Sequence, residues 1–257
     1  MAKSLAIGVD IGGTGIKAGV VDLETGHLQG DRLTVATPKR GSIAAITQVV
    51  HEMVRELDAD AEHPLGIGFP AALRRGLAYS AENLADEWQY TDVPGAFSAE
   101  FQRPVAVIND GDAAGLAEVL YGSGRGIGGT ILVVTLGTGV GTSLIHNGRL
   151  IPNIELGRLP VRGKPAGERV ANSVRTRKKL SWAFWARDLG KFIEQLDTAA
   201  SPEMVIIGGG VSKKAHKFIP LINVPLRVVP ASLRNDAGIV GAAANAAFTL
   251  PRPKRED

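Results

Sequence analysis

The chain of 257 residues contains no cysteine, which excludes disulfide bonds and metal sites built from thiolates. It also lacks any run near the roughly 18 continuous apolar residues of a membrane-spanning helix, so we expect no membrane partner. The first residues enter an expected strand directly, without the cleavage pattern of a secretory signal peptide. These absences fit a location in the reducing cytoplasm.

The chain also has little excess charge of either sign, since its formal net charge is only +3. The charges are nevertheless unevenly distributed along the sequence. Residues 158–179 carry eight basic side chains against one acid, a net charge of +7, whereas the rest of the chain has 21 basic and 25 acidic residues, a net charge of −4. A basic field on a mildly acidic body indicates an anionic ligand, although a solvated helix face is the commoner meaning of a charge run. The basic side chains are Arg158, Arg162, Lys164, Arg169, Arg175, Arg177, Lys178 and Lys179.

The stretch 105–114 carries the clearest chemical signal. Its first four residues are apolar and mostly β-branched, which predicts a buried strand that runs into Asn109 and Asp110. We expect Gly111 to make the turn and a helix to follow over residues 113–120. Asp110 would then lie at the carboxyl end of a parallel strand, where open α/β sheets bind ligands. The alternative is that Asp110 only caps the helix.

The expected elements occur in a duplicated pattern. A strand, a glycine-rich turn, a second strand and a hairpin begin at Leu5 and again at Thr130, about 125 residues later. We therefore expect an α/β fold of two similar lobes with a central cleft. The N-terminal lobe would comprise residues 1–112 with the C-terminal helix 236–248, and the C-terminal lobe residues 113–235. The other strands are expected at 16–22, 33–37, 65–70, 142–146, 149–151, 204–207 and 226–229, the other helices at 43–57 and from 181, and a loop-rich segment at 71–104.

Two glycine-rich turns occupy matching places in the two halves, in Asp10-Ile-Gly-Gly-Thr-Gly15 and Leu136-Gly-Thr-Gly-Val-Gly141. Phosphate binding selects glycine at such turns, because backbone N–H groups must converge on the anion without an intervening Cβ. Each turn lies between two strands, which argues against a dinucleotide fingerprint or a Walker loop, since both need a following helix. Glycine hairpins also serve as plain connectors, but two copies and Gly208-Gly209-Gly210 after a third strand favour phosphate binding.

In combination these motifs resemble the signatures of the ROK sugar kinases, a family with the actin/hexokinase-like (ribonuclease H-like) fold. The resemblance covers nearly the whole chain, and within the family it is closest to the polyphosphate glucokinases. The motifs shared with the family are residues 10–17, Asn109-Asp110, residues 136–141, Glu155-Leu-Gly157 and residues 208–211. Those shared with the polyphosphate branch are residues 66–70, 110–118, Leu180-Ser-Trp182, 208–213 and 234–242.

The resemblance implies roles for individual residues. Asp110 matches the general base that takes the proton from the sugar hydroxyl, and a carboxylate beside the nucleophile is a recurrent part of phosphoryl transfer. Asp10 matches a ligand that holds Mg²⁺ through water. The implied sugar-binding residues are Asn83, Asn109, Glu155, Arg158 and Glu168, although Glu168 could instead only neutralise the basic run. The implied donor-binding residues are Asp10, Gly12, Gly13, Thr14, Gly15, Lys17, Gly137, Thr138, Gly139, Gly141, Gly208, Gly209, Gly210 and Lys213.

The sequence departs from the family pattern at two places. The wider family has a cysteine-rich zinc motif, which is lost here as in the polyphosphate branch, so no zinc is expected. Where relatives have Glu-Leu-Gly-His, this chain has Glu155-Leu-Gly-Arg158. Since the missing histidine is a sugar ligand in relatives, Arg158 puts sugar affinity and selectivity in question. Three residues apart, Arg158 and Glu155 are expected to meet, and a guanidinium could grip the carboxylate with two hydrogen bonds.

The leading hypothesis is a kinase that phosphorylates the 6-hydroxyl of glucose, and of mannose as a further hexose, with polyphosphate, ATP or both as donor and with Mg²⁺. The basic segment favours a long polyanionic donor, because ATP alone needs no extended basic track. The alternatives are a repressor of the same family, which would need an N-terminal DNA-binding helix-turn-helix, and a sugar-binding protein with weak or lost activity. The resemblance further implies a homodimer, and no nucleic-acid partner is expected.

Overall fold

The computed structural model describes residues 4–58, 63–79 and 84–250, which form two compact units. The N-terminal unit contains the residues up to Ala113 and those from Gly238 onward, and the C-terminal unit comprises Ala114–Ala237. Among the described residues, no helix has both the length and the apolar character needed to cross a bilayer.

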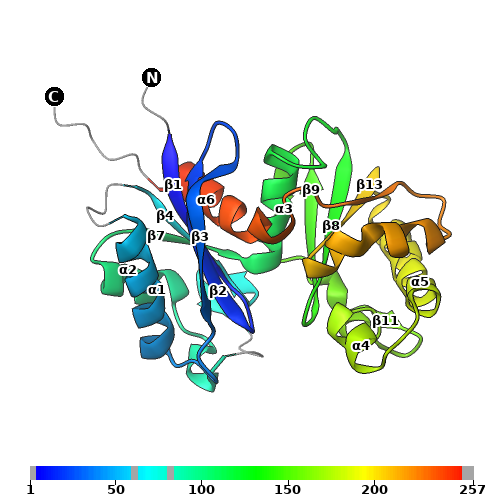
Figure 1. Ribbon diagram of the computed structural model, residues 1–257, viewed down its shortest axis with the longest axis horizontal. Coiled ribbons are helices and arrows are strands. Elements are labelled where there is room, and N and C mark those ends of the chain that lie inside the picture. Colours follow the sequence, from blue (N-terminus) through cyan, green and yellow to red (C-terminus); the bar gives the residue numbers. More distant parts are fainter. Residues whose placement is uncertain (1–3, 59–62, 80–83, 251–257) are drawn as a thin grey trace. The chain divides into compact units, whose positions relative to one another are not determined.

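The N-terminal unit is built on a five-stranded sheet with the order β3-β2-β1-β4-β7. Strands β1, β2 and β3 are antiparallel, whereas β1, β4 and β7 are parallel, so the carboxyl ends of these three meet at one edge. Helices α1 and α2 lie on one side of the sheet and α6 on the other (Figure 1). The bounds are β1 Leu5–Ile11, β2 Gly15–Asp22, β3 His27–Ala36, β4 Leu65–Phe69, β7 Val105–Asn109, α1 Ile43–Leu57, α2 Val93–Phe101 and α6 Ala237–Thr249.

Successive residues of β1 face opposite sides of this sheet, and the two sides pack differently. Ile7, Val9 and Ile11 point into the apolar core beneath α1 and α2. On the opposite face, a Cβ on Gly8 would lie 1.9 Å from the Ile239 carbonyl oxygen, and one on Gly66 equally close to that of Ala242. The two glycines therefore let the backbone of α6 lie directly on the sheet.

The C-terminal unit repeats this topology with the order β10-β9-β8-β13-β14. Strands β10, β9 and β8 are antiparallel, whereas β8, β13 and β14 are parallel. This repeat of the N-terminal topology confirms the duplication expected from the sequence. Alternate residues of β8 pack on the two faces, Ile131 and Val133 with Val119 of α3, and Leu132 and Val134 with α5. The bounds are α3 Asp110–Leu120, β8 Thr130–Leu136, β9 Val140–His146, β10 Arg149–Ile151, α5 Trp182–Ala200, β13 Met204–Gly208 and β14 Val228–Pro230.

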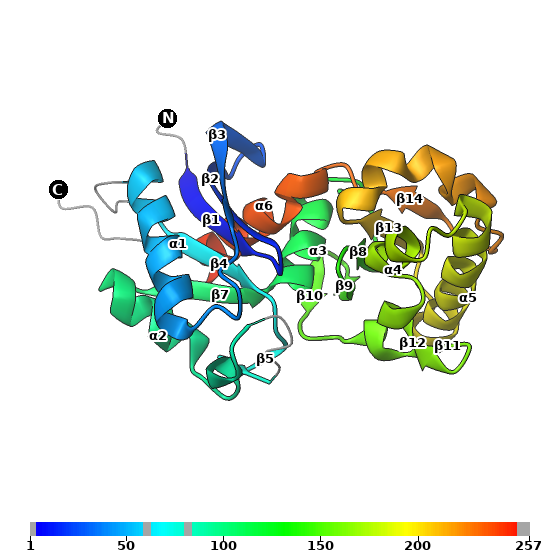
Figure 2. The same cartoon turned by 60° about the horizontal axis from the view of Figure 1, so that its bottom comes forward.

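Short elements fill the connections between these strands and helices. The β11–β12 hairpin lies beside α5, where Gln195 Nε2 donates a 2.8 Å hydrogen bond to the Pro160 carbonyl (Figure 2). In the N-terminal unit these elements are β5 Leu73–Arg74, β6 Leu77–Ala78 and the 3₁₀ helix η1 Asp86–Trp88. In the C-terminal unit they are η2 Leu156–Arg158, β11 Pro160–Val161, β12 Lys164–Pro165, η3 Ala166–Glu168, α4 Asn172–Arg177, η4 Gly210–Lys217, η5 Ile219–Leu221 and η6 Arg234–Asp236.

Four local predictions are wrong. Helix α3 begins at Asp110 without a turn at Gly111, because the Asn109 side chain caps it by accepting the Asp112 N–H at 3.0 Å. The supposedly loop-rich segment 71–104 contains α2, which Asp92 caps by accepting the Gly95 N–H. Strand β14 begins at Val228 rather than at residue 226, and β3 already begins at His27.

Candidate active site

The first glycine turn connects β1 to β2 and places two opposite charges side by side. Asp10 and Lys17 are directly paired across the strands, and Lys17 Nζ lies 2.8 Å from Asp10 Oδ2. At the turn itself, the Gly12 N–H donates to the Gly15 carbonyl at 3.1 Å. Gly13 and Thr14 form its exposed tip. The arrangement leaves the backbone of the tip accessible to an anion, with a lysine at its base.

A second element supports Asp10 from the side. A Cβ on Gly238, the second residue of α6, would lie 2.7 Å from Asp10 Cγ, so only a glycine lets the helix approach the carboxylate this closely. The amino end of a helix carries a partial positive charge, which favours an adjacent carboxylate. Gly238 and Asp10 are 228 positions apart in the sequence, and the fold places them side by side.

Asn109 and Asp110 lie at the same sheet edge as Asp10. In the register, Asp10 pairs with Gly68 of β4, and Gly68 pairs with Ile108 of β7. Two inter-strand steps separate β1 from β7, which corresponds to about 10 Å. Asp110 is half-buried and accepts the N–H of Gly111 at 2.8 Å. Asn109 thus accepts the Asp112 N–H and Asp110 accepts the Gly111 N–H, so both side chains contact the first turn of α3.

The amide of Asn109 is already engaged on both sides. Its Oδ1 accepts the Asp112 N–H, and its Nδ2 donates to the Ala71 carbonyl at 3.1 Å. One N–H and one acceptor position remain for a ligand, since a side-chain amide offers two of each. Any contribution of Asn109 to sugar binding is therefore limited to those remaining positions.

In the C-terminal unit, two glycine segments meet at the ends of β8 and β13. The turn after β8 is closed by the Gly137 N–H, which donates to the Gly139 carbonyl at 3.1 Å. Gly209 has a φ of 80°, and a Cβ there would lie 2.6 Å from the Leu136 carbonyl oxygen. Both the left-handed backbone and the close approach require glycine. Gly141 belongs to β9, paired with Thr135, rather than to the turn as predicted.

The basic helix α4 is attached to this turn by Ser173. The Ser173 N–H donates to the Gly137 carbonyl at 3.1 Å, and its hydroxyl donates to the Thr138 carbonyl at 2.6 Å. These hydrogen bonds place the amino end of α4 on the turn and extend the basic segment away from it. Sequence reasoning missed Ser173; the signal was a serine beside the amino end of a short basic helix.

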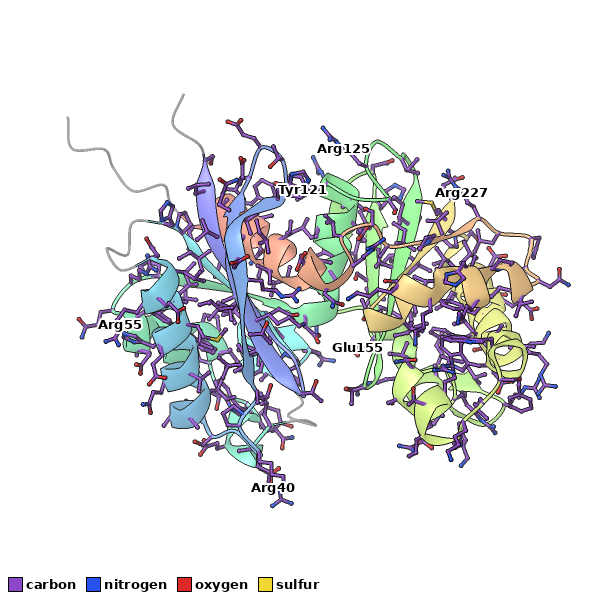
Figure 3. All side chains as sticks on the ribbon, in the orientation of Figure 1. Arg40, Arg55, Tyr121, Arg125, Glu155 and Arg227 are labelled. Atoms are coloured by element: carbon purple, nitrogen blue, oxygen red, sulfur yellow. The ribbon has the colours of Figure 1, made fainter. Side chains whose placement is uncertain are left out.

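Glu155 is positioned at the same end of the C-terminal sheet. Thr142 of β9 donates to the Ile154 carbonyl at 2.6 Å and accepts the Leu156 N–H at 2.9 Å. A Cβ on Gly157 would lie 2.2 Å from the Val140 carbonyl oxygen, so Glu155-Leu-Gly157 is held flat on β9. Figure 3 shows Glu155 at the opposite end of this sheet from Arg125.

Arg158 contacts Glu155, as expected, but through a weaker arrangement than the predicted pair of hydrogen bonds. Arg158 Nε lies 3.9 Å from Glu155 Oε2, which is beyond hydrogen-bond distance. The two side chains are 62% and 38% exposed, respectively. Glu168 lies exposed on η3, which packs against the Arg158-containing η2.

The other predicted residues have mixed surroundings. Lys213 is exposed on η4, three residues after Gly210. In the basic segment, Lys164, Arg177, Lys178 and Lys179 are exposed, whereas the Arg175 guanidinium packs 3.9 Å from the centre of the Trp182 ring. Arg162 pairs with Asp188 at 3.0 Å. Asn83 lies outside the described residues.

The Asp10 carboxylate fits the coordination preferences of Mg²⁺. In the part of the chain that the structure describes, no group of three His, Asp or Glu side chains gathers into a metal cage. Magnesium usually retains several waters and binds through one or two carboxylates and substrate phosphates, so it needs no such cage. A single half-buried carboxylate beside a glycine turn is suitable for that mode.

The family model and the relatives that match this chain agree with one another. The family model described as "ROK family" matches residues 6–153. The chain is 43% identical to a polyphosphate glucokinase of Mycobacterium leprae, over 94% of this chain and 74% of the relative. It is 42% identical to a polyphosphate glucokinase of Mycobacterium tuberculosis, over 92% and 89%. The crystal structure of an inorganic polyphosphate/ATP-glucomannokinase from Arthrobacter sp. strain KM aligns with a TM-score of 0.91 at 43% identity, covering 96% of this chain and all of that one.

Proposed function

This chain belongs to the ROK family, and we propose that it transfers a phosphoryl group from inorganic polyphosphate or ATP to the 6-hydroxyl of glucose, with mannose as a second acceptor. The names of the relatives at 42–43% identity support this reaction. The observation that carries the choice of donor is the pair of hydrogen bonds from Ser173, because they join a basic helix to a glycine turn. A long polyanion could bind to both.

Asp110 acts as the general base in this proposal. As the sugar oxygen attacks phosphorus, its proton passes to the Asp110 carboxylate and a new O–P bond forms. The bond between that phosphorus and the bridging oxygen of the donor breaks, which leaves ADP or a polyphosphate shortened by one unit. Catalysis then depends mainly on positioning and electrostatic stabilisation. The location of Asp110 at the end of β7, with the helix cap supplied by Asn109, supports this role.

In this proposal, the sugar is held by polar side chains. We assign the hydroxyl contacts to Glu155, Glu168, Asn83 and the remaining N–H of Asn109. Arg158 reduces the contribution of Glu155, because the sugar must displace a neighbouring positive charge. A sugar-binding protein with weak kinase activity is therefore the second candidate function.

The donor phosphates would be bound by the glycine turns and nearby lysines. Gly12, Gly13, Thr14 and Gly15 with Lys17 form one group, and Gly137, Thr138, Gly139 and Gly141 with Gly208, Gly209, Gly210 and Lys213 form the other. Mg²⁺, held through water by Asp10, would neutralise charge on the donor phosphates. We further propose a cytoplasmic location and a homodimer, the latter to be tested by light scattering.

A coupled assay tests the function directly. Purified protein is given glucose and Mg²⁺ with either long-chain polyphosphate or ATP, and formation of glucose 6-phosphate is followed. We expect turnover with both donors and the higher kcat/KM with polyphosphate. Turnover with neither donor, although glucose binds, would contradict the proposal and leave a sugar-binding protein.

A further inference from the structure

A second basic segment, η4, lies in the C-terminal unit, and only its first lysine, Lys213, has a role in the function described so far. Helix η4 carries Lys213, Lys214, His216 and Lys217 on its exposed side and no acidic residue. Its other side, with Val211 and Ala215, is buried in the core of the unit. The fold therefore fixes this helix with its basic side chains in solvent.

A stack of three side chains connects η4 to the basic segment on α4. The Arg175 guanidinium lies 3.9 Å from the centre of the Trp182 ring. The same indole stacks on Phe218 at 5.8 Å between ring centres and an interplanar angle of 15°. Arg175 belongs to α4, and Phe218 directly follows Lys217 at the end of η4. Trp182 thus contacts one residue from each basic element.

The stack is anchored in the core of the unit. Trp185 packs edge-on against both Trp182 and Phe218, and its own Nε1 donates to the Val170 carbonyl at 3.1 Å. Trp185 and Phe218 are fully buried, whereas Trp182 is half-buried. Arg175 also donates to the Leu180 carbonyl at 3.5 Å, so the turn between α4 and α5 is fixed as well. The two basic elements therefore both contact the same indole, which packs on the core of the unit.

We propose that η4 and α4 form one continuous binding surface for inorganic polyphosphate, with Trp182 as the residue that positions its two halves. Each half begins at a glycine segment, α4 at the Gly137–Gly139 turn and η4 at Gly208–Gly210, and these segments are in contact through Gly209 and Leu136. A chain that starts at the glycine segments can continue over either half, and a long chain can contact both. ATP and tripolyphosphate are too short to need the second half. This inference rests on the proposed use of polyphosphate as donor.

The test separates chain length from charge. In Lys214→Glu with Lys217→Glu, we expect the KM for long-chain polyphosphate to rise about tenfold, because several phosphate contacts are lost together. The KM for tripolyphosphate should change by less than about twofold, since that donor reaches few of those contacts. The matched control is Lys191→Glu with Arg227→Glu. Lys191 pairs with Glu194 on α5, and Arg227 points outward beside β14 (Figure 3), so the control changes the net charge equally away from the surface.

Trp182 is tested with two substitutions and a readout that needs no turnover. Binding of long-chain polyphosphate to the full chain without glucose is measured by calorimetry. Trp182→Phe preserves the stack and should bind like the wild type, whereas Trp182→Ala should lose about tenfold in affinity. Circular dichroism checks that each variant is folded. If Trp182→Ala unfolds, the lysine pair still decides the question.

Several outcomes would overturn the inference. One is an equal rise in KM for both donor lengths in Lys214→Glu with Lys217→Glu. Another is an equal effect of the control pair. A third is competition by single-stranded DNA as strong as that by polyphosphate, which would indicate a nucleic-acid surface instead. Binding that depends on Trp182, in a protein that does not phosphorylate glucose, would support the surface and contradict only the proposed function.

Discussion

The hydroxyl of Ser173 donates a 2.6 Å hydrogen bond to the carbonyl of Thr138, and so joins the amino end of α4 to the exposed glycine turn of the C-terminal unit. Thirty-five residues separate the two. A turn with exposed glycines is free to change shape, whereas one tied to a helix keeps its N–H groups in place for a phosphate. The bond therefore links the fold of the basic segment to the proposed binding of the donor.

Ser173→Ala should weaken donor binding. Loss of this hydrogen bond costs about 1 kcal/mol, which corresponds to an increase of about fivefold in KM for both polyphosphate and ATP. The matched control is Ser181→Ala, because Ser181 caps α5 by accepting the Phe184 N–H at 3.2 Å and does not contact the turn. The control should lose comparable stability in thermal unfolding and keep its donor constants. Equal donor constants in both variants would contradict the role of Ser173.

Asp110→Asn should reduce turnover by about 10² to 10⁴ and leave glucose affinity within a few-fold. The amide preserves size and can still accept the Gly111 N–H, but it cannot take the proton from the sugar hydroxyl. Single-turnover phosphorylation and glucose binding by calorimetry separate the two effects. Asp86→Asn, at an exposed position in η1, provides a matched control with wild-type turnover. If Asp110→Asn kept a tenth or more of the turnover, Asp110 would not be the base.

The use of polyphosphate should fall more steeply with salt than the use of ATP. A long polyanion that touches several of the basic side chains displaces more counterions, by analogy with nucleic-acid backbones. Charge reversal at the exposed pair Lys178 and Lys179 should raise the polyphosphate KM about tenfold and reduce the salt slope. Lys191→Glu with Arg227→Glu again serves as the control. Equal salt slopes for both donors would contradict a basic track.

The sequence predicted the elements that local patterns specify. The strands on both sides of each glycine turn are confirmed, as is the hairpin at Asn147-Gly148, where φ values of 49° and 76° give the turn that this pair favours. The family and the actin/hexokinase-like fold class are also confirmed, because the matching motifs extend along the chain. The roles of the individual site residues remain predictions.

Contacts between distant segments could not be predicted in the same way. Gly238 looks like an ordinary helix residue until the fold places it against Asp10. The Ser173 hydroxyl likewise bonds to Thr138, 35 residues away, and the capping role of Asn109 depends on where α3 begins. Helix α2 was missed because its weakly amphipathic sequence includes proline and glycine, although Asp92-Val-Pro94 is a typical helix start.

Gly238→Ala should impair Mg²⁺-dependent activity. The added methyl group would lie 2.7 Å from Asp10 Cγ, so the carboxylate must rotate away from its place beside Lys17. We expect the Mg²⁺ concentration for half-maximal rate to rise about tenfold, as for other changes next to a metal ligand. The free energy of unfolding should fall by about 1–3 kcal/mol. Gly190→Ala in α5 is the control. The nearest atom to a Cβ there is Ile222 Cγ2 at 3.8 Å, an ordinary van der Waals distance, so this substitution should not destabilise the helix.

Arg158→His should lower the KM for glucose. In the native chain, Arg158 Nε lies 3.9 Å from Glu155 Oε2, so glucose must compete with an internal partner for this carboxylate. Both side chains are more than a third exposed, and ion pairs of this kind contribute at most about 1 kcal/mol. The expected fall in KM is therefore up to about fivefold, smaller than a buried pair with two hydrogen bonds would give.

The competing explanation is that Arg158 serves the donor, as a member of the basic segment, and takes no part in sugar binding. The two explanations differ in which constant changes. Glucose and polyphosphate constants are therefore measured together for Arg158→His and for Arg187→His, an exposed arginine on α5 that lies over the Phe184 ring. A lower glucose KM in Arg158→His alone supports competition at Glu155. An unchanged glucose KM would mean that removing the internal partner of Glu155 has no effect on sugar binding. Together with a raised polyphosphate KM, it would show that Arg158 acts on the donor.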